Sequence, residues 1–151
     1  MSEIRLTERD NKIIKEIERW RICQGRHIKE LAGFGNQRTC DKRLQKLIGA
    51  EIITRKKILY GVAGIYSNTN KARNIAGIAT GESKIKVEQI GHDIAVLDAA
   101  IYINKKFGIP FEAMITEKEL HSLDGFGVRR HRPDFVIKHK VTQAVAEAWQ
   151  S

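Results

Sequence analysis

The spacing of apolar residues predicts three helices in the first half of the chain. Within residues 7–21, apolar side chains recur three and four positions apart on an otherwise charged segment, and they are Ile13, Ile14, Ile17 and Trp20. The segment Thr7-Glu8-Arg9-Asp10 is typical of a helix start. The Thr hydroxyl can cap an amide of the first turn, and the acidic residue at the third helical position can reach back. The first helix is therefore predicted over residues 7–21.

Two further helices follow in the same half. A short apolar pattern ended by Gly33 predicts a small helix over residues 27–32. Asn36 can cap a third helix over residues 37–48, in which Gly49 is expected to act as the C-terminal glycine. The apolar positions of this third helix fall at i, i+4, i+7 and i+8, and they are Cys40, Leu44, Leu47 and Ile48.

The pattern then changes to β-structure. Residues 51–55, 58–60 and 64–67 are rich in β-branched and aromatic side chains and are separated by a basic run and by glycines. They predict a β-hairpin directly after the third helix. Residues 70–77 are predicted to form a short closing helix or a linker.

The second half predicts one long helix and a small sheet. Residues 78–87 contain Gly and Ser and resemble a connector. Apolar residues at a spacing of three to four predict a helix over residues 88–107, stopped by glycine and proline. Strands are predicted over residues 111–115, 135–137 and 141–149. The fold class is therefore predicted to be α+β, with a first domain over 1–77, a linker over 78–87 and a second domain over 88–151.

The charge of the chain is concentrated in its first half. The 151 residues contain 27 Lys and Arg against 18 Asp and Glu, which gives a formal net charge of +9. Residues 1–75 hold 17 basic and 8 acidic side chains, whereas residues 76–151 hold 10 of each. An affinity for a polyanion is therefore expected of the first domain, and the second half needs a different explanation.

Several classes of protein are excluded by the composition. No apolar run approaches the roughly 20 residues of a membrane span, and the N-terminus has no apolar signal region, so we expect a cytoplasmic protein. Cys23 and Cys40 form no metal or redox motif, and Cys40 is expected to be a small core residue. The five histidines lack metal-ligand spacing and no phosphate-binding or dinucleotide motif is visible, so neither a metal nor a cofactor is expected.

The predicted third helix carries a basic face. Three short helices with a glycine-containing turn before the third are typical of a helix-turn-helix, in which the start of the last helix enters the major groove. The polar side chains of this face are Gln37, Arg38, Thr39, Lys42, Arg43 and Lys46. Gln37 and Arg38 are of the types that contact base edges, and the basic residues further along can neutralise phosphates. The alternative is an ordinary solvated helix face.

The predicted hairpin would be the wing of a winged helix. Its basic tip, Arg55-Lys56-Lys57, suits the phosphate backbone or the minor groove. Tyr60 and Tyr66 could stack on nucleic acid, but packing against the small sheet is the preferred interpretation.

Four short motifs distributed over nearly the whole chain resemble the replication-relaxation family of plasmids and integrative elements. They are Leu6-Thr7-x-Arg9-Asp10, Ile90-Gly91-His92-Asp93-Ile94-Ala95-Val96, Thr116-Glu117-x-Glu119-Leu120 and Arg132-Pro133-Asp134. The resemblance implies an N-terminal winged helix followed by a domain similar to the restriction-endonuclease-like fold. Members of the family accompany plasmid replication or conjugative mobilisation.

A nuclease of that fold would use carboxylates to hold Mg²⁺ and a lysine to orient water. Glu119, Asp134 and Glu147 follow one another in the expected order, but Trp149 stands where the lysine belongs and the chain stops at Ser151. The second domain is therefore interpreted as a truncated, inactive version of the fold, with these three acids as weak catalytic candidates.

The combined prediction is a sequence-specific binder of double-stranded DNA, encoded on a plasmid or mobile element. It would act as a transcriptional regulator or as an accessory factor in replication or mobilisation. A homodimer is expected through the second domain, and other replication or conjugation proteins are possible partners. Two alternatives stay open: a metal-dependent DNA nuclease, and a protein-interaction module whose winged helix has lost DNA binding. A second basic cluster, residues 129–132, is either a solvated loop or a further contact with DNA or an acidic partner.

Overall fold

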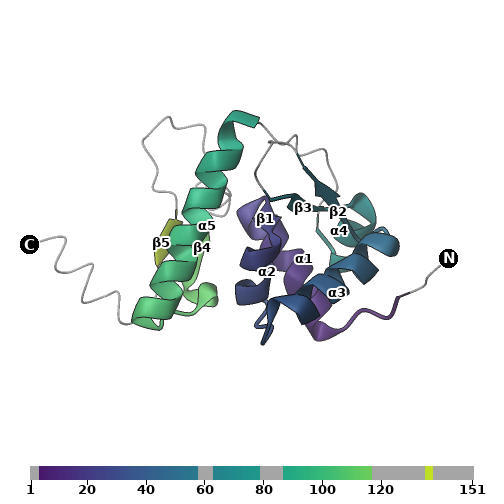
Figure 1. Ribbon diagram of the computed structural model, residues 1–151, viewed down its shortest axis with the longest axis horizontal. Coiled ribbons are helices and arrows are strands. Elements are labelled where there is room, and N and C mark those ends of the chain that lie inside the picture. The colour runs from purple at the N-terminus through teal and green to yellow at the C-terminus, as the bar shows by residue number, and fades with distance from the viewer. Residues whose placement is uncertain (1–3, 58–62, 79–86, 117–134, 138–151) are drawn as a thin grey trace, which may run out of the picture. The chain divides into compact units, whose positions relative to one another are not determined.

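The computed structural model describes residues 4–57, 63–78, 87–116 and 135–137 of this α+β protein (Figure 1). Contacts divide the chain into two compact units, Met1–Ile101 and Tyr102–Ser151. The boundary falls within a single helix, α5 (Val87–Phe107). The predicted division into 1–77, 78–87 and 88–151 stays a prediction, since residues 79–86 lie outside the described part.

The first unit combines helices with one small three-stranded sheet. In chain order its elements are α1 (Glu8–Trp20), β1 (Cys23–Gln24), α2 (Gly25–Leu31), α3 (Gln37–Gly49), β2 (Ile53–Lys56), β3 (Ile65–Asn68) and α4 (Asn70–Ala76). The sheet has the order β1-β3-β2, and both pairings are antiparallel. The predicted helices are thus confirmed within one or two residues at each end. The two-residue strand β1 was not predicted, because the segment reads as a break in the helical pattern.

Local hydrogen bonds set the helix starts as predicted. The Asp10 amide donates to the Thr7 hydroxyl at 3.2 Å, and the Thr7 amide donates to the Asp10 carboxylate at 2.8 Å. Asn36 caps α3 by accepting from the Thr39 amide at 2.8 Å. The prediction for the end of α3 was wrong: Gly49 is still helical, and the left-handed backbone conformation falls two residues later, on Glu51 (φ 60°).

The core of the first unit is formed by the predicted apolar stripes. Ile13, Ile14 and Ile17 of α1 are at most 1% exposed, and Cys40 and Leu44 of α3 are fully buried. Both cysteines are free and buried, which confirms Cys40 as a core residue. Burial raises the pKa of the Cys40 thiol to about 11, so this thiol stays protonated and unreactive at neutral pH.

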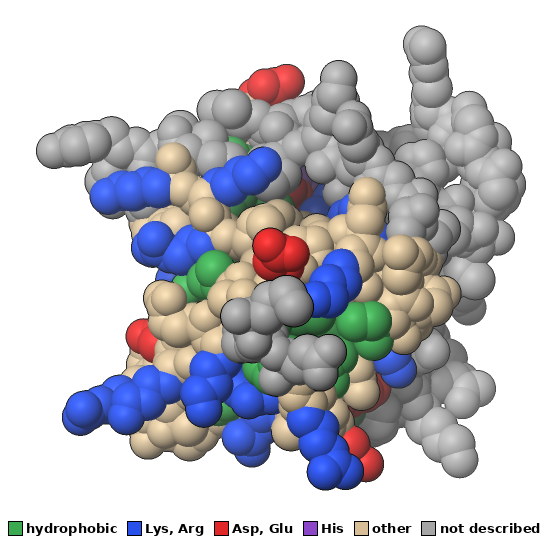
Figure 2. Space-filling view, turned by 90° about the vertical axis from the view of Figure 1, so that its right-hand side faces the viewer, with side chains coloured by type: hydrophobic (Ala, Val, Ile, Leu, Met, Phe, Trp, Pro, Cys, Tyr) green, Lys and Arg blue, Asp and Glu red, His purple; other side chains and the backbone are tan. Residues whose placement is uncertain are grey.

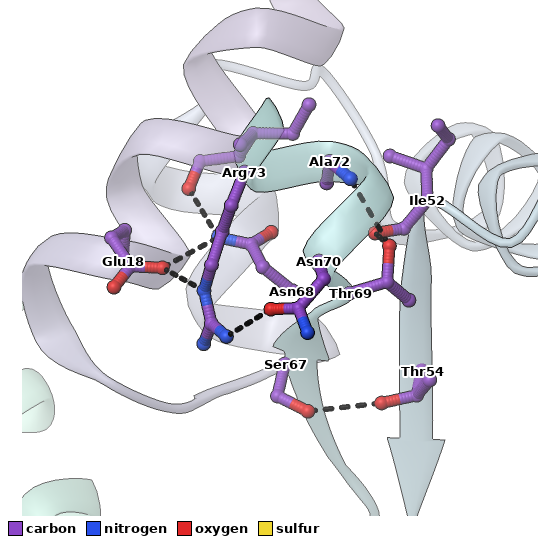
Figure 3. Close-up of polar contacts among 10 residues, drawn as sticks. Glu18, Ile52, Thr54, Ser67, Asn68, Thr69, Asn70, Ala72 and Arg73 are labelled. Carbon is purple, nitrogen blue, oxygen red and sulfur yellow. Dashed lines mark hydrogen bonds and ion pairs between the residues drawn. The ribbon is translucent and has the colours of Figure 1, made fainter. Parts of the chain in front are cut away.

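A polar cluster joins α1, β3 and α4 (Figure 3). The buried Asn68 side chain donates to the Ile14 carbonyl at 2.8 Å and to the Glu18 carboxylate at 3.3 Å. Arg73 donates to the same Glu18 oxygen at 3.0 Å. Thr69 accepts from the Ala72 amide and thereby caps α4. These contacts fix the end of β3 and helix α4 against α1.

The first part of α5 is attached to α2 and to the sheet within the first unit. Ile90 packs with Ile22 and Ile65, and Ile94 packs against this cluster. The Asp98 carboxylate accepts from Nε2 of the buried His27 at 2.8 Å and also pairs with Arg26. Because Nδ1 of His27 accepts the Gln24 amide hydrogen at 3.0 Å, the imidazole must be neutral, with its proton on Nε2.

This arrangement predicts a loss of stability in mild acid. Burial lowers the pKa of His27 despite the opposing effect of the hydrogen bond that His27 donates to Asp98. Below a pH of about 6.5 the unfolded chain therefore binds a proton that the folded chain does not bind, and the free energy of unfolding falls as pH drops. Urea unfolding at pH 7.5 and 5.5 should show a larger decrease for wild type than for His27→Gln. Equal decreases in the free energy of unfolding of the two proteins would show that His27 is not the cause of the loss.

In the second unit, a 3-10 turn, η1 (Phe111–Ala113), precedes strand β4 (Met114–Thr116). Strand β4 pairs antiparallel with β5 (Phe135–Ile137). The strand predicted over 111–115 therefore begins later than expected. Pro110 stands at the start of the turn, and the buried Phe111 and Ala113 occupy it. The strand predicted over 135–137 is confirmed, and the one predicted over 141–149 lies outside the described residues.

Candidate nucleic-acid interface

Helix α3 has one buried and one exposed face. Cys40, Leu44 and Leu47 are fully buried and hold the helix against the rest of the first unit. Of the predicted DNA-binding residues on the opposite face, four have exposed side chains, and they are Arg38, Thr39, Lys42 and Lys46. Arg38, Lys42 and Lys46 lie along one line of the helix, because residues at i, i+4 and i+8 share a face, and Thr39 lies beside Arg38 in the first turn.

Gln37 is engaged inside the protein. Its amide nitrogen donates to the Gly25 carbonyl at 3.1 Å and to the Asp41 carboxylate at 2.9 Å. The bond to Gly25 connects the start of α3 to the start of α2, and the bond to Asp41 lies within α3. The base contact predicted for Gln37 stays a prediction, and its amide nitrogen already has these two intramolecular partners.

Arg43 is also engaged inside the protein. Its Nε donates to the Asp10 carboxylate at 2.8 Å, and one terminal nitrogen contacts the second Asp10 oxygen and the Arg5 carbonyl. The Asp10 side chain is fully buried. Burial acts to raise the pKa of Asp10, but the hydrogen bonds from Arg43 and Thr7 outweigh it and hold that pKa below its usual value. Arg43 therefore neutralises a buried carboxylate.

The three basic residues of the hairpin have different surroundings. Lys56 and Lys57 are exposed at the end of β2. The Arg55 guanidinium lies over Gly64, where a Cβ atom would come within 2.8 Å of it. Tyr66 is only 6% exposed, which agrees with the packing interpretation. Burial raises the pKa of the Tyr66 hydroxyl, even though the nearby Arg55 acts in the opposite direction. Tyr60 lies outside the described residues.

Cations are abundant on the surface around these elements. Figure 2 shows Lys and Arg side chains spread over one face of the molecule, with few carboxylates among them. Five of the predicted contacts form no ion pair with any residue that the structure describes, and they are Arg38, Lys42, Lys46, Lys56 and Lys57. Exposed cations of this kind are free to release counterions on binding a polyanion.

A groove separates the first turn of α1 from the exposed face of α3. It has a volume of about 790 Å³, and its lining includes Arg9, Phe34, Lys42 and Lys46. The Arg9 guanidinium lies 4.5 Å from the centre of the Phe34 ring. In the sequence, Arg9 stands in a helix start and in one of the four family motifs, and neither predicts a contact with DNA.

The remaining sequence predictions fall on other parts of the chain. The weak catalytic candidates Glu119, Asp134 and Glu147, and the basic cluster 129–132, lie outside the described residues. Within the described residues, no group of three or more His, Cys, Asp or Glu side chains could hold a metal ion. None of the described helices is long and apolar enough to cross a membrane.

Comparisons with protein-family models, with curated proteins and with solved structures gave no match. The resemblance to the replication-relaxation family therefore stays a prediction based on four short motifs.

Proposed function

We propose that the first unit is a winged-helix domain that binds double-stranded DNA with sequence preference through α3. The observation that carries this proposal is the exposed face of α3, where Arg38, Lys42 and Lys46 have no ion-pair partner among the described residues. Cations on one helix face without carboxylate partners make the local potential positive, and a nucleic acid that binds such a face releases counterions.

The order of the elements supports the proposal. Helices α2 and α3 are joined by a turn that contains Gly33, whose φ of +73° lies in the left-handed region. The antiparallel strands β2 and β3 follow α3 directly, as the wing of a winged helix does. Helix α3 would be the recognition helix, with its N-terminal side chains toward the base edges.

The geometry also divides the candidate residues by role. Arg38 and Thr39 are exposed in the first turn of α3 and would read base edges. Residues further along the same face and on the hairpin would contact phosphates, and they are Lys42, Lys46, Lys56 and Lys57. Gln37 and Arg43 would instead hold α3 in place.

Substitutions at Arg38 and Lys56 test this division. Arg38→Ala should reduce the discrimination between a preferred duplex and a random one by about 1–3 kcal/mol. Lys56→Ala should weaken binding to both duplexes equally and lower the salt slope of the affinity by about one. Fluorescence anisotropy over a range of salt concentrations measures both quantities, with Gln45→Ala as a control on α3. Equal effects of Arg38→Ala on the two duplexes would remove α3 from the reading role.

The biological setting that we propose follows the family resemblance: a regulator or an accessory factor in the replication or mobilisation of a plasmid or mobile element. A homodimer would read two half-sites about one helical turn apart. Absence of binding to any duplex at low salt would favour the alternative of a protein-interaction module.

A further inference from the structure

The groove between α1 and α3 opens onto the same surface as the proposed recognition face. Lys42 and Lys46 belong both to the exposed face of α3 and to the groove wall. The opposite wall is the first turn of α1, with Glu8 and Arg9, both exposed. A strand of nucleic acid that follows the exposed face of α3 would therefore also pass along the first turn of α1.

The groove has an excess of positive charge, which suits a polyanion, when the ion pair between Asp10 and Arg43 is counted as neutral. Asp10 is paired with Arg43, so its negative charge is compensated within the protein. Three exposed cations then line the groove against one exposed carboxylate, that of Glu8. The resulting local field is positive, although Glu8 opposes it.

Arg9 is oriented in a way that favours phosphate recognition. Its guanidinium lies over the Phe34 ring, and this ring is itself 7% exposed and held in the protein. A planar guanidinium fixed on a ring loses less freedom on binding than a free lysine does, and its fork matches two phosphate oxygens. The cation keeps its charge in this arrangement, because an aromatic ring does not neutralise it.

We propose that this groove holds one sugar-phosphate strand of the duplex and that Arg9 contacts a phosphate. This inference rests on the proposed DNA binding and extends it to α1. One strand would then be contacted from two elements, since Arg9 comes from α1 and both Lys42 and Lys46 come from α3. The negative charge of Glu8 would repel the phosphates and so reduce the affinity of the groove for the strand.

The test uses two substitutions with opposite expected signs in the full chain. Arg9→Gln should weaken binding to a 20-base-pair duplex about three- to tenfold at 0.1 M salt and lower the salt slope by about one. Glu8→Gln should strengthen binding, because it removes the one exposed carboxylate of the groove. Lys15→Gln is the matched control, since Lys15 is an exposed cation of α1 outside the groove lining. Both Arg9→Gln and Lys15→Gln remove one positive charge.

Two results would overturn the inference: Arg9→Gln and Lys15→Gln weaken binding equally, or Glu8→Gln has no effect. Thermal unfolding of each variant separates a loss of contact from a loss of folding. Arg9→Lys provides a second check, because it keeps the charge and should retain the salt slope while losing part of the affinity. If wild type fails to bind any duplex, the proposed function itself is wrong. If wild type binds a duplex and either of these two results is found, only the assignment of the groove to a DNA strand fails.

Discussion

Arg43→Met is expected to lower the free energy of unfolding by about 3 kcal/mol at neutral pH. The substitution leaves the Asp10 carboxylate fully buried without its cation. A methionine fills a similar volume, so the loss reports mainly the uncompensated charge. Urea denaturation followed by circular dichroism measures it. A decrease below about 0.5 kcal/mol, the size typical of surface positions, would contradict the role given to Arg43.

The cause of this loss can be identified from its pH dependence and from a double variant. Without Arg43, the pKa of Asp10 should rise relative to wild type, because burial is then opposed only by the hydrogen bonds with Thr7. Acid therefore neutralises the carboxylate more readily in the variant, and the difference in stability from wild type should shrink toward pH 4. Asp10→Asn combined with Arg43→Met removes both charges and keeps an acceptor for the Thr7 amide. The double variant should be more stable than Arg43→Met alone. A double variant that is less stable would show that Arg43 acts in some other way.

Leu44→Ala is expected to lower the free energy of unfolding by about 3 kcal/mol as well, because it opens a cavity behind α3. Leu44 is fully buried in the middle of the helix. The same helix offers a control in the exposed neighbour Gln45, where Ala should change stability by less than about 0.5 kcal/mol. Chemical denaturation of the two variants measures the contrast. Similar small effects at both positions would mean that α3 is not anchored through this face.

The helices could be predicted because their signals are local. The stripe of Ile13, Ile14 and Ile17 and the caps at Thr7 and Asn36 depend only on residues within one or two turns. The end of α3 was harder to predict, since Glu51 adopts the left-handed conformation in place of Gly49. The left-handed conformation of Glu51 is accompanied by backbone hydrogen bonds after α3. In one of them the Ile52 amide donates to the Leu47 carbonyl at 3.0 Å.

The roles of individual side chains were less predictable than the elements that carry them. Arg43 and Lys42 are adjacent basic residues on one helix, yet only Arg43 meets a buried carboxylate, which lies 33 positions earlier in the chain. The residue type of Gln37 predicts a contact with a base edge, but nothing in the sequence indicates that its amide donates to the Gly25 carbonyl. Arg9 is a candidate because α1 and α3 line one groove, which their separation in the sequence does not indicate. The spacing of residues along the chain cannot predict these contacts, because they join residues that are far apart in the sequence.

Selection from a pool of random duplexes tests the central claim most directly. The purified full chain is mixed with the pool at low salt, retained fragments are sequenced, and wild type is compared with Arg38→Ala. The account predicts that wild type enriches a defined sequence, that Arg38→Ala loses the preference at one or two base pairs of it, and that retention falls steeply with salt. Retention without enrichment, or no retention at low salt, would contradict the claim that α3 reads DNA.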